Sequence, residues 1–154
     1  MKINSSIRAI YGELLELHKL LEARVKEAFE ISKRKQWFFL CRIKEEESFA
    51  LKLETGRIAN PRAMDDFFAC TLVVENRSSI SEALKVVEEI CDIVSRRPPE
   101  EGKTHKSPDE FCFDDLRLYV KLKASDQLPP TPLDDIIFEI QIKTFLQHAW
   151  SIAT

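Results

Sequence analysis

The sequence predicts an α+β fold in which helices flank a mixed β-sheet. Stretches of β-type composition alternate with amphipathic stretches of helical spacing along the chain, and this alternation is typical of α/β and α+β sheets. Towards the C-terminus, two strand-like stretches follow one another with a loop and no helical stretch between them. A sheet that combines both kinds of connection is expected to be mixed.

The size and composition fit one globular domain. The 154 residues are 44% hydrophobic and 32% charged, which is enough apolar material for a single core. The net charge is −3, so any contact to phosphate has to come from local basic clusters. Neither a secretion signal nor an apolar stretch long enough to span a membrane is visible, so a cytoplasmic location without membrane contact is expected.

The first 36 residues are predicted to form an N-terminal helical segment. From Ser5 to about Lys35, apolar residues recur at helical spacing with charges between them, which is typical of one amphipathic helix or of a pair. We expect this segment to pack on a domain that spans residues 37–154. Within that domain, residues 37–41 have β-type composition, and the charged stretch 45–54 predicts a helix that ends near Gly56.

The rest of the chain predicts three more strands and two more helices. Residues 67–74 form the next strand. The capping box Ser79-Ile-Ser-Glu82 is expected to start a helix that runs through Cys91 and Val94 until Pro98-Pro99 stops it. The runs 111–122 and 136–144 are predicted strands, each preceded by a loop, 98–110 and 124–135. Thr144 and Gln147 have the spacing of another capping box, so a last helix is expected, apparently cut short after about two turns.

The last predicted strand carries polar side chains on one face. Alternation places phenylalanine and isoleucine on one side and Glu139, Gln141 and Lys143 on the other. A strand this rich in isoleucine is typical of the interior of a covered sheet, where polar side chains must be hydrogen-bonded or line a cleft. The alternative is an edge strand whose second face meets water.

Four polar residues are predicted to converge where the first strand of the domain meets its helix, and we call them the basic corner. Arg42 and Lys44 are two residues apart and point the same way, while Ser48 and Lys52 are four apart and share a helix face. Three cations and a hydroxyl suit a polyphosphate, which needs charge compensation and several donors. The alternative is a solvated charged face.

Acidic residues accompany two of the predicted strands. Asp65 and Asp66 precede the strand at 67–74, and Glu139 lies on the last strand. An aspartate and a glutamate on neighbouring strands suit Mg²⁺, which prefers oxygen ligands and completes its shell with water and substrate phosphates. The alternative makes Asp65 and Asp66 a turn and Glu139 a surface residue.

The cysteines and histidines do not predict a metal centre. The four cysteines are widely spaced inside apolar segments, which favours buried reduced thiols over disulfides or zinc ligands. The three histidines are isolated from one another, and none is followed by aspartate. A metal-hydrolase cluster is therefore not predicted.

Three pieces of the sequence carry most of the polar residues named above, and their order along the chain is informative. They are Arg42-Ile-Lys-Glu-Glu-Glu-Ser-Phe-Ala-Leu-Lys52, then Asp66-Phe-Phe-Ala-Cys-Thr-Leu-Val-Val74, then Glu139-Ile-Gln-Ile-Lys-Thr144 followed by Gln147-His-Ala-Trp150. The combination resembles the RelA/SpoT-type nucleotide pyrophosphokinases, the (p)ppGpp synthetases, whose signature near the end reads E-x-Q-x-R-T…H-A-W. The resemblance covers about residues 38–154 and implies a fold of the nucleotidyltransferase kind.

The resemblance also implies a role for each matching residue. The basic corner would bind the phosphates of ATP, while Asp66 and Glu139 would bind Mg²⁺ and serve catalysis. Glu139 would also help to activate the acceptor hydroxyl. The implied reaction is attack of the 3′-hydroxyl of GTP or GDP on the β-phosphate of ATP, which transfers pyrophosphate and releases AMP. Phe113, Gln141 and His148 are the candidate acceptor contacts.

Two departures from the family pattern leave the acceptor open. Where the family reads D-x-x-G-x-R, this chain has Asp66-Phe-Phe-Ala-Cys-Thr71, without the arginine. Where it reads G-Y-x-S-x-H, the best match is Cys112-Phe-Asp-Asp-Leu-Arg117, in which Phe113 can still stack on a base. We prefer Asp66 to Asp65 as the metal ligand. When Asp66 is aligned with the aspartate of the family pattern, Ala69 stands at the position of its small residue, glycine.

Three functions follow as alternatives. The first is a stand-alone synthetase that acts on ATP and GTP or GDP and lacks the family's hydrolase half, since no His-Asp pair occurs in the sequence. The second is a toxin-like relative that transfers pyrophosphate to the 3′ end of tRNA. The third is a catalytically degenerate domain that binds a nucleotide or a protein. Formation of a homo-oligomer and binding of an antitoxin partner are also left open.

Overall fold

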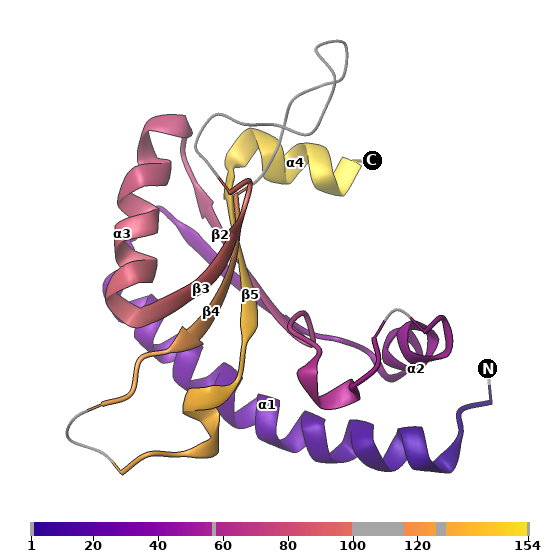
Figure 1. Cartoon of the computed structure of the whole chain (residues 1–154). Helices are drawn as coiled ribbons and strands as arrows, with labels where there is room; N and C mark the ends of the chain where they lie inside the picture. The colour runs from indigo at the N-terminus through magenta and orange to yellow at the C-terminus, as the bar shows by residue number, and fades with distance from the viewer. Residues whose placement is uncertain (1, 57, 100–115, 126–128, 154) are drawn as a thin grey trace.

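The computed structural model describes residues 2–56, 58–99, 116–125 and 129–153. In these ranges, five strands form one sheet in the order β1-β2-β5-β4-β3 (Figure 1). The central strands β2 and β5 run parallel, and every other neighbouring pair is antiparallel. The predicted mixed α+β sheet is confirmed. The strands are β1 (Phe38–Ile43), β2 (Phe68–Val74), β3 (Cys91–Arg97), β4 (Leu116–Leu122) and β5 (Phe138–Thr144).

Helices α1 and α3 cover one face of this sheet (Figure 1). Helix α1 (Ser5–Ser32) is a single helix, and its buried positions recur every three or four residues, as an amphipathic helix requires. Leu21, Val25 and Phe29 of α1 pack in one core with side chains of α3 (Ile80–Ile90) and of the sheet. How far residues 1–36 form a unit separate from residues 37–154 stays a prediction.

The opposite face of the sheet is flanked by α2 (Glu46–Glu54) at one end and α4 (Phe145–Ala153) at the other (Figure 1). We call it the open face, because side chains that point from it remain partly accessible. Phe38 and Leu40 of β1, for example, are 59% and 47% exposed on this side. Among the described residues, no helix combines the length and the apolarity that crossing a bilayer requires.

Two predicted helix ends are confirmed, one by its hydrogen bonds and one by its backbone conformation. Thr144 and Gln147 form a reciprocal cap at the start of α4: the Thr144 N–H donates to Gln147 Oε1 at 2.8 Å, and the Gln147 N–H donates to Thr144 Oγ1 at 3.2 Å. After α2, Gly56 has a φ of +67°, the left-handed conformation that glycine adopts without steric cost.

The third helix begins where it was predicted, at Ile80 with Ser79 as its N-cap residue, but the predicted capping box and the predicted C-terminal end are wrong. Ser79 makes no side-chain cap, because the preceding short 3₁₀ turn is capped by Asn76, whose Oδ1 accepts from the Ser79 N–H at 3.3 Å. At the other end, α3 stops at Ile90, and Cys91–Arg97 forms β3, which pairs with β4. Pairing along a whole strand outweighs the helical spacing of Cys91 and Val94.

The strand predicted at 111–122 is observed as Leu116–Leu122, and its first part lies outside the described residues. Cys41, Cys70 and Cys91 are free thiols, as predicted. Cys41 and Cys70 are register partners in β1 and β2, with their sulfur atoms 3.6 Å apart. Cys112 lies outside the described residues.

Candidate active site on the open face

Glu139 lies on the central strand of the sheet and is almost fully buried. The residue is 5% exposed. Tyr119 Oη donates a hydrogen bond to its Oε2 at 3.1 Å, and Gln141 Nε2 donates one to its Oε1. Because β5 lies between β2 and β4, the alternative of an edge strand is wrong, and Glu139 is not a surface residue. Its carboxylate is satisfied by hydrogen bonds, as burial requires.

Tyr119 is a neutral partner for this carboxylate. Burial and the charge of Glu139 raise the pKa of the Tyr119 hydroxyl above its usual value, so the phenol keeps its proton and donates at neutral pH. The guanidinium of Arg97 lies 5.7 Å from the centre of the Tyr119 ring, at the distance of a cation–π contact.

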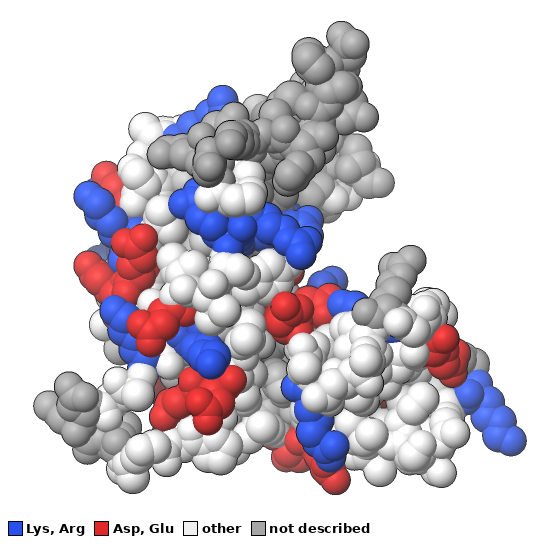
Figure 2. Space-filling model, viewed as in Figure 1, with Lys and Arg blue, Asp and Glu red and all other residues white. Residues whose placement is uncertain are grey.

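Strand register arranges polar residues of the open face in two rows across the sheet. One row joins Arg42, Ala69, Glu139 and Tyr119 as successive register partners. The next row joins Thr71, Gln141, Arg117 and Arg97. Figure 2 shows basic side chains gathered beside the hollow next to the sheet, with acidic side chains at its lower edge.

Asp66 lies in the turn that leads into β2 and is held by two lysines. Lys52 Nζ is 2.6 Å from Asp66 Oδ1, and Lys44 Nζ is 3.3 Å from Oδ2. Burial tends to raise the pKa of Asp66, but the hydrogen bond from Lys52 and the charges of both lysines outweigh it, so the pKa lies below its usual value. The carboxylate is therefore ionised at neutral pH.

The basic corner surrounds a small cavity beside Asp66. Arg42, Lys44 and Ser48 line a space of about 280 Å³, and the Lys44 N–H donates to the Phe67 carbonyl at 2.8 Å, which ties the end of β1 to the start of β2. Lys52 joins this group through Asp66. Residues from a strand, a turn and a helix thus meet at one place, where two lysines hold one carboxylate and Arg42 lines the adjoining cavity.

The sequence comparison identifies the family. The profile described as "Region found in RelA / SpoT proteins" matches residues 41–153, a range that contains the basic corner, Asp66 and Glu139. The chain belongs to the RelA/SpoT family. No curated protein matches the sequence significantly.

Several solved structures share the fold at low identity. Small alarmone synthetase 1 of Bacillus subtilis, bound to its product pppGpp, has a TM-score of 0.66 and 16% identity, with 95% of this chain and 78% of that chain covered. Small alarmone synthetase 2 of the same organism has a TM-score of 0.67, 20% identity and coverages of 93% and 76%. A GTP pyrophosphokinase family protein from Streptococcus pneumoniae has a TM-score of 0.59, 18% identity and coverages of 91% and 70%.

The candidate acceptor contacts lie in different places. Gln141 is on the open face beside Glu139. His148 lies on α4, beyond the other end of β5, and its Nδ1 is buried without a hydrogen-bond partner among the described residues. Phe113 lies outside the described residues. Asp65 lines a different cavity from the basic corner, together with residues of α1.

Sequence reasoning missed three residues of the open face. Arg97, Arg117 and Tyr119 lie on β3 and β4 in the rows that contain Glu139 and Gln141. Alternation along β4 could have shown that Arg117 and Tyr119 share a face. In the described ranges, no group of three or more histidine, cysteine, aspartate or glutamate residues forms a metal-binding cluster.

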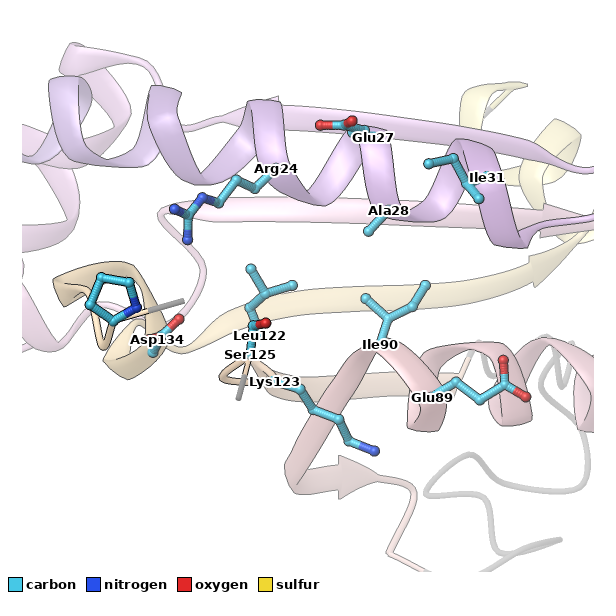
Figure 3. Close-up of a pocket in the computed structure, with 11 residues that line it drawn as sticks. Arg24, Glu27, Ala28, Ile31, Glu89, Ile90, Leu122, Lys123, Ser125 and Asp134 are labelled. Carbon is cyan, nitrogen blue, oxygen red and sulfur yellow. The ribbon is translucent and has the colours of Figure 1, made fainter. Parts of the chain in front are cut away.

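A larger cavity lies away from this site. About 500 Å³ in volume, it is lined by α1, by the end of α3 and by the segment after β4, on the helix-covered side. Figure 3 shows Ala28 and Ile31 of α1 on one side of it and Ile90 and Lys123 on the other. Its place on the opposite side of the sheet separates it from the basic corner.

Proposed function

We propose that this RelA/SpoT-family domain transfers pyrophosphate from ATP to the 3′-hydroxyl of GTP or GDP, giving (p)ppGpp. The observation that carries the proposal is the meeting of Lys44, Lys52 and Asp66 beside the cavity of the basic corner. This group adjoins an open face that presents the buried carboxylate of Glu139. Solved relatives hold pppGpp in one structure and AMPCPP in another, which supports nucleotides as the substrates.

The basic corner is assigned to the phosphates of ATP. Arg42 offers a planar fork of donors and the lysines offer compact charges, so together they match a chain of phosphate oxygens. The Ser48 hydroxyl adds a neutral donor in the same cavity. Such fixed cations also stabilise the charge that develops as the phosphoryl bond breaks.

The two acidic side chains fit Mg²⁺ by their chemistry. Asp66 lies in the turn that leads into β2, and Glu139 lies on the neighbouring parallel strand β5. Mg²⁺ is commonly held by one or two carboxylates plus substrate phosphates. When bound, the ion neutralises charge on the transferring phosphates. We assign Asp66 and Glu139 as its ligands.

Glu139 is also assigned to the acceptor hydroxyl. Tyr119 and Gln141 fix its orientation with one hydrogen bond to each oxygen, and the remaining lone pairs can accept a proton. In the proposed step, the 3′-oxygen bonds to the β-phosphorus of ATP and its proton passes to Glu139. The bond between the β-phosphorus and the oxygen that links it to the α-phosphorus breaks, and AMP leaves with that oxygen.

Transfer of pyrophosphate to tRNA is a second candidate function, and the residues on the acceptor side of the site support it. Thr71 stands where the family has an arginine, whereas Arg117 and Arg97 extend the row of Thr71 and Gln141 on neighbouring strands. This rearranged positive charge differs from the family pattern at the place where the acceptor phosphates would bind, and phosphate contacts of this kind also serve RNA. Phe113, Gln141 and His148 stay proposed acceptor contacts.

A transfer assay with labelled ATP tests the proposal. The purified chain is incubated with Mg²⁺, ATP labelled at the β-phosphate, and GDP, GTP or tRNA in separate reactions. We expect label in (p)ppGpp with the guanosine nucleotides, and we expect Asp66→Asn and Glu139→Gln each to lower the rate by a factor on the order of 100 or more, since both act on developing charge.

The control variant is Glu16→Gln, which removes an exposed carboxylate of α1 and should leave the rate unchanged. Circular dichroism checks that each variant is folded. Label on tRNA would favour the second candidate, and absence of transfer to all three acceptors would support a degenerate domain. Full activity of Asp66→Asn would remove Asp66 from the site.

A further inference from the structure

A second cavity lies next to the candidate active site, on the far side of the turn that contains Asp66. It has a volume of about 440 Å³ and is bounded by α1, by the 3₁₀ turn η1 (Pro61–Ala63) and by the segment that follows η3 (Pro132–Asp135). We call it the η1 pocket. Its volume is in the range of small-molecule sites. Much of its wall is apolar, formed by Leu14, Leu17, Ala63, Met64, Ile136 and Ile137.

His18 is the buried polar group of the η1 pocket. The residue is 5% exposed and lines the cavity, and its Nδ1 donates to the Leu14 carbonyl at 2.7 Å. Burial lowers the pKa of His18, although the bond to Leu14 opposes this effect, so the ring is neutral at neutral pH with its proton on Nδ1. Nε2 is then an acceptor, and the described residues give it no hydrogen-bond partner.

His18 Nε2 can accept a hydrogen bond from a ligand in the pocket. It is not among the buried side-chain atoms that lack a partner in the described residues, so solvent can also reach this nitrogen. The ring of Phe67 lies 4.5 Å from that of His18, centre to centre, so a hydrophobic wall holds one side of the imidazole. The histidine is fixed in place by its bond to Leu14, and the residue lines the pocket.

The charged groups of the pocket also favour a ligand that carries a positively charged hydrogen-bond donor. Its lining contains three carboxylates, Glu13, Asp65 and Asp135, against the single guanidinium of Arg62. Arg62 is already paired with Glu13 at 2.8 Å, whereas neither Asp65 nor Asp135 makes an ion pair within the described residues. The cavity therefore presents a neutral acceptor and two uncompensated carboxylates above apolar walls.

We propose that the η1 pocket binds a small organic cation, a protonated amine or an amidine carried on an apolar body. The charged head would donate to His18 Nε2 and to the carboxylates, and the apolar body would cover the leucine, methionine and isoleucine side chains. An anionic ligand such as a nucleotide phosphate is disfavoured by the same carboxylates. This proposal stands apart from the proposed transfer reaction, because it rests on the pocket alone.

The place of the pocket gives a bound cation close neighbours in the candidate active site. Asp65 directly precedes Asp66, and Ile137 lies two residues before Glu139. Both segments that enter the parallel strands β2 and β5 thus form part of its wall. The ligand would sit behind the two candidate metal ligands, on elements that position them.

Titration of the whole chain with benzamidine tests the proposal. Benzamidine is an amidinium on an aromatic ring, and benzamide is its neutral counterpart of nearly the same shape. We expect benzamidine to bind with a Kd on the order of 1 mM, as suits so small a ligand, and benzamide to bind at least about tenfold more weakly. Backbone amide NMR shifts at Met64 and Ile136 should locate the site.

Asp135→Asn is the decisive variant, because Asp135 is exposed at the rim and its loss does not disturb the core. We expect it to weaken benzamidine binding about tenfold, whereas Glu16→Gln on the exposed side of α1 should bind like the unaltered chain. His18→Phe should weaken binding too. If His18→Phe does not fold, the Asp135→Asn result decides by itself. Equal affinity for benzamidine and benzamide, unchanged affinity of Asp135→Asn, or no binding of benzamidine up to about 10 mM would each overturn the proposal.

Discussion

The two faces of the sheet use the same strands for different purposes. On β5, Ile140 is fully buried among the side chains of the helix-covered face, while its neighbour Glu139 is almost fully buried on the open face. Ile140 needs only apolar contacts. Glu139 needs a hydrogen bond to each oxygen, and Tyr119 and Gln141 of the same face supply them. Burial alone therefore does not distinguish a core position from a functional one.

The two faces are therefore expected to tolerate amino-acid substitutions differently. The helix-covered face gains its stability from close packing, so each lost methyl group costs free energy. The open face is arranged in rows of polar side chains, and most of them are partly accessible. Changes there should act on hydrogen bonds and on charge, with smaller effects on folding.

The largest difference in the loss of unfolding free energy should appear between substitutions of two neighbouring residues of β5. Ile140→Ala should lower the free energy of unfolding by about 2–5 kcal/mol, because it leaves a cavity in the core. Glu139→Gln should lower it by about 1 kcal/mol, since the amide keeps the shape and one acceptor. Urea denaturation followed by tryptophan fluorescence measures both. Similar losses for the two variants would show that the faces do not differ in this way.

A smaller difference in stability is expected between the loss of two tyrosine hydroxyls. Tyr119 Oη donates to the charged Glu139, whereas Tyr11 Oη donates to the neutral Lys44 carbonyl at 2.8 Å. Hydrogen bonds to charged groups are worth more, so Tyr119→Phe should cost about 1.5 kcal/mol and Tyr11→Phe about 1 kcal/mol. The transfer rate should fall in Tyr119→Phe, because Glu139 loses its orientation. A larger loss of stability in Tyr11→Phe would contradict this ranking.

The smallest effect is expected at Glu75, which lies just beyond the end of β2, outside both faces. Trp37 Nε1 donates to Glu75 Oε2 at 2.9 Å. Backbone hydrogen bonding, together with the side-chain bonds from Ser79, Trp37 and Gln36, lowers the pKa of Glu75 from 4.5 to about 2. Because the pKa is lower in the folded state, the contribution to stability is full above pH 4.5 and is lost as the pH falls towards 2.

Glu75→Gln should therefore be less stable than the unaltered chain at neutral pH, and the two should converge in acid. Thermal unfolding between neutral pH and pH 2 measures the gap. Glu16→Gln serves as a control, because it removes an exposed carboxylate of α1. A gap that stays constant down to the lowest pH would assign the effect of Glu75 to its shape and not to its charge.

Periodicity was enough to predict β5, the sheet class and the helical character of the N-terminal segment, because these segments repeat apolar residues at a regular spacing. It left open whether that segment is one helix or two, and α1 is one. It failed at Cys91, where helical spacing continues into a strand that pairs with β4. Arg42, Lys44 and Lys52 were predicted to meet, and the lysines do meet at Asp66. That two of the cations hold this carboxylate could not be predicted, since it depends on how the turn folds back on α2.

The rows of the open face were also beyond sequence reasoning. Tyr119 and Glu139 are brought together by pairing between β4 and β5, and Arg97 reaches Tyr119 through the pairing of β3 with β4. Alternation states which side of a strand a residue occupies, but strand order decides which residues lie beside it. The η1 pocket depends in the same way on the packing of α1 against two turns.

The strand order has a consequence for how the chain is made. Ala69 of β2 pairs with Glu139 of β5, about 70 residues further along the chain, so the strands of the two outer ladders, β1 with β2 and β3 with β4, are synthesised before the strand that joins them. Until then, each ladder presents an unpaired inner edge, the kind of surface that attracts other chains. Completion of one seven-residue strand closes both edges at once, and synthesis that stops before it should yield an aggregating product.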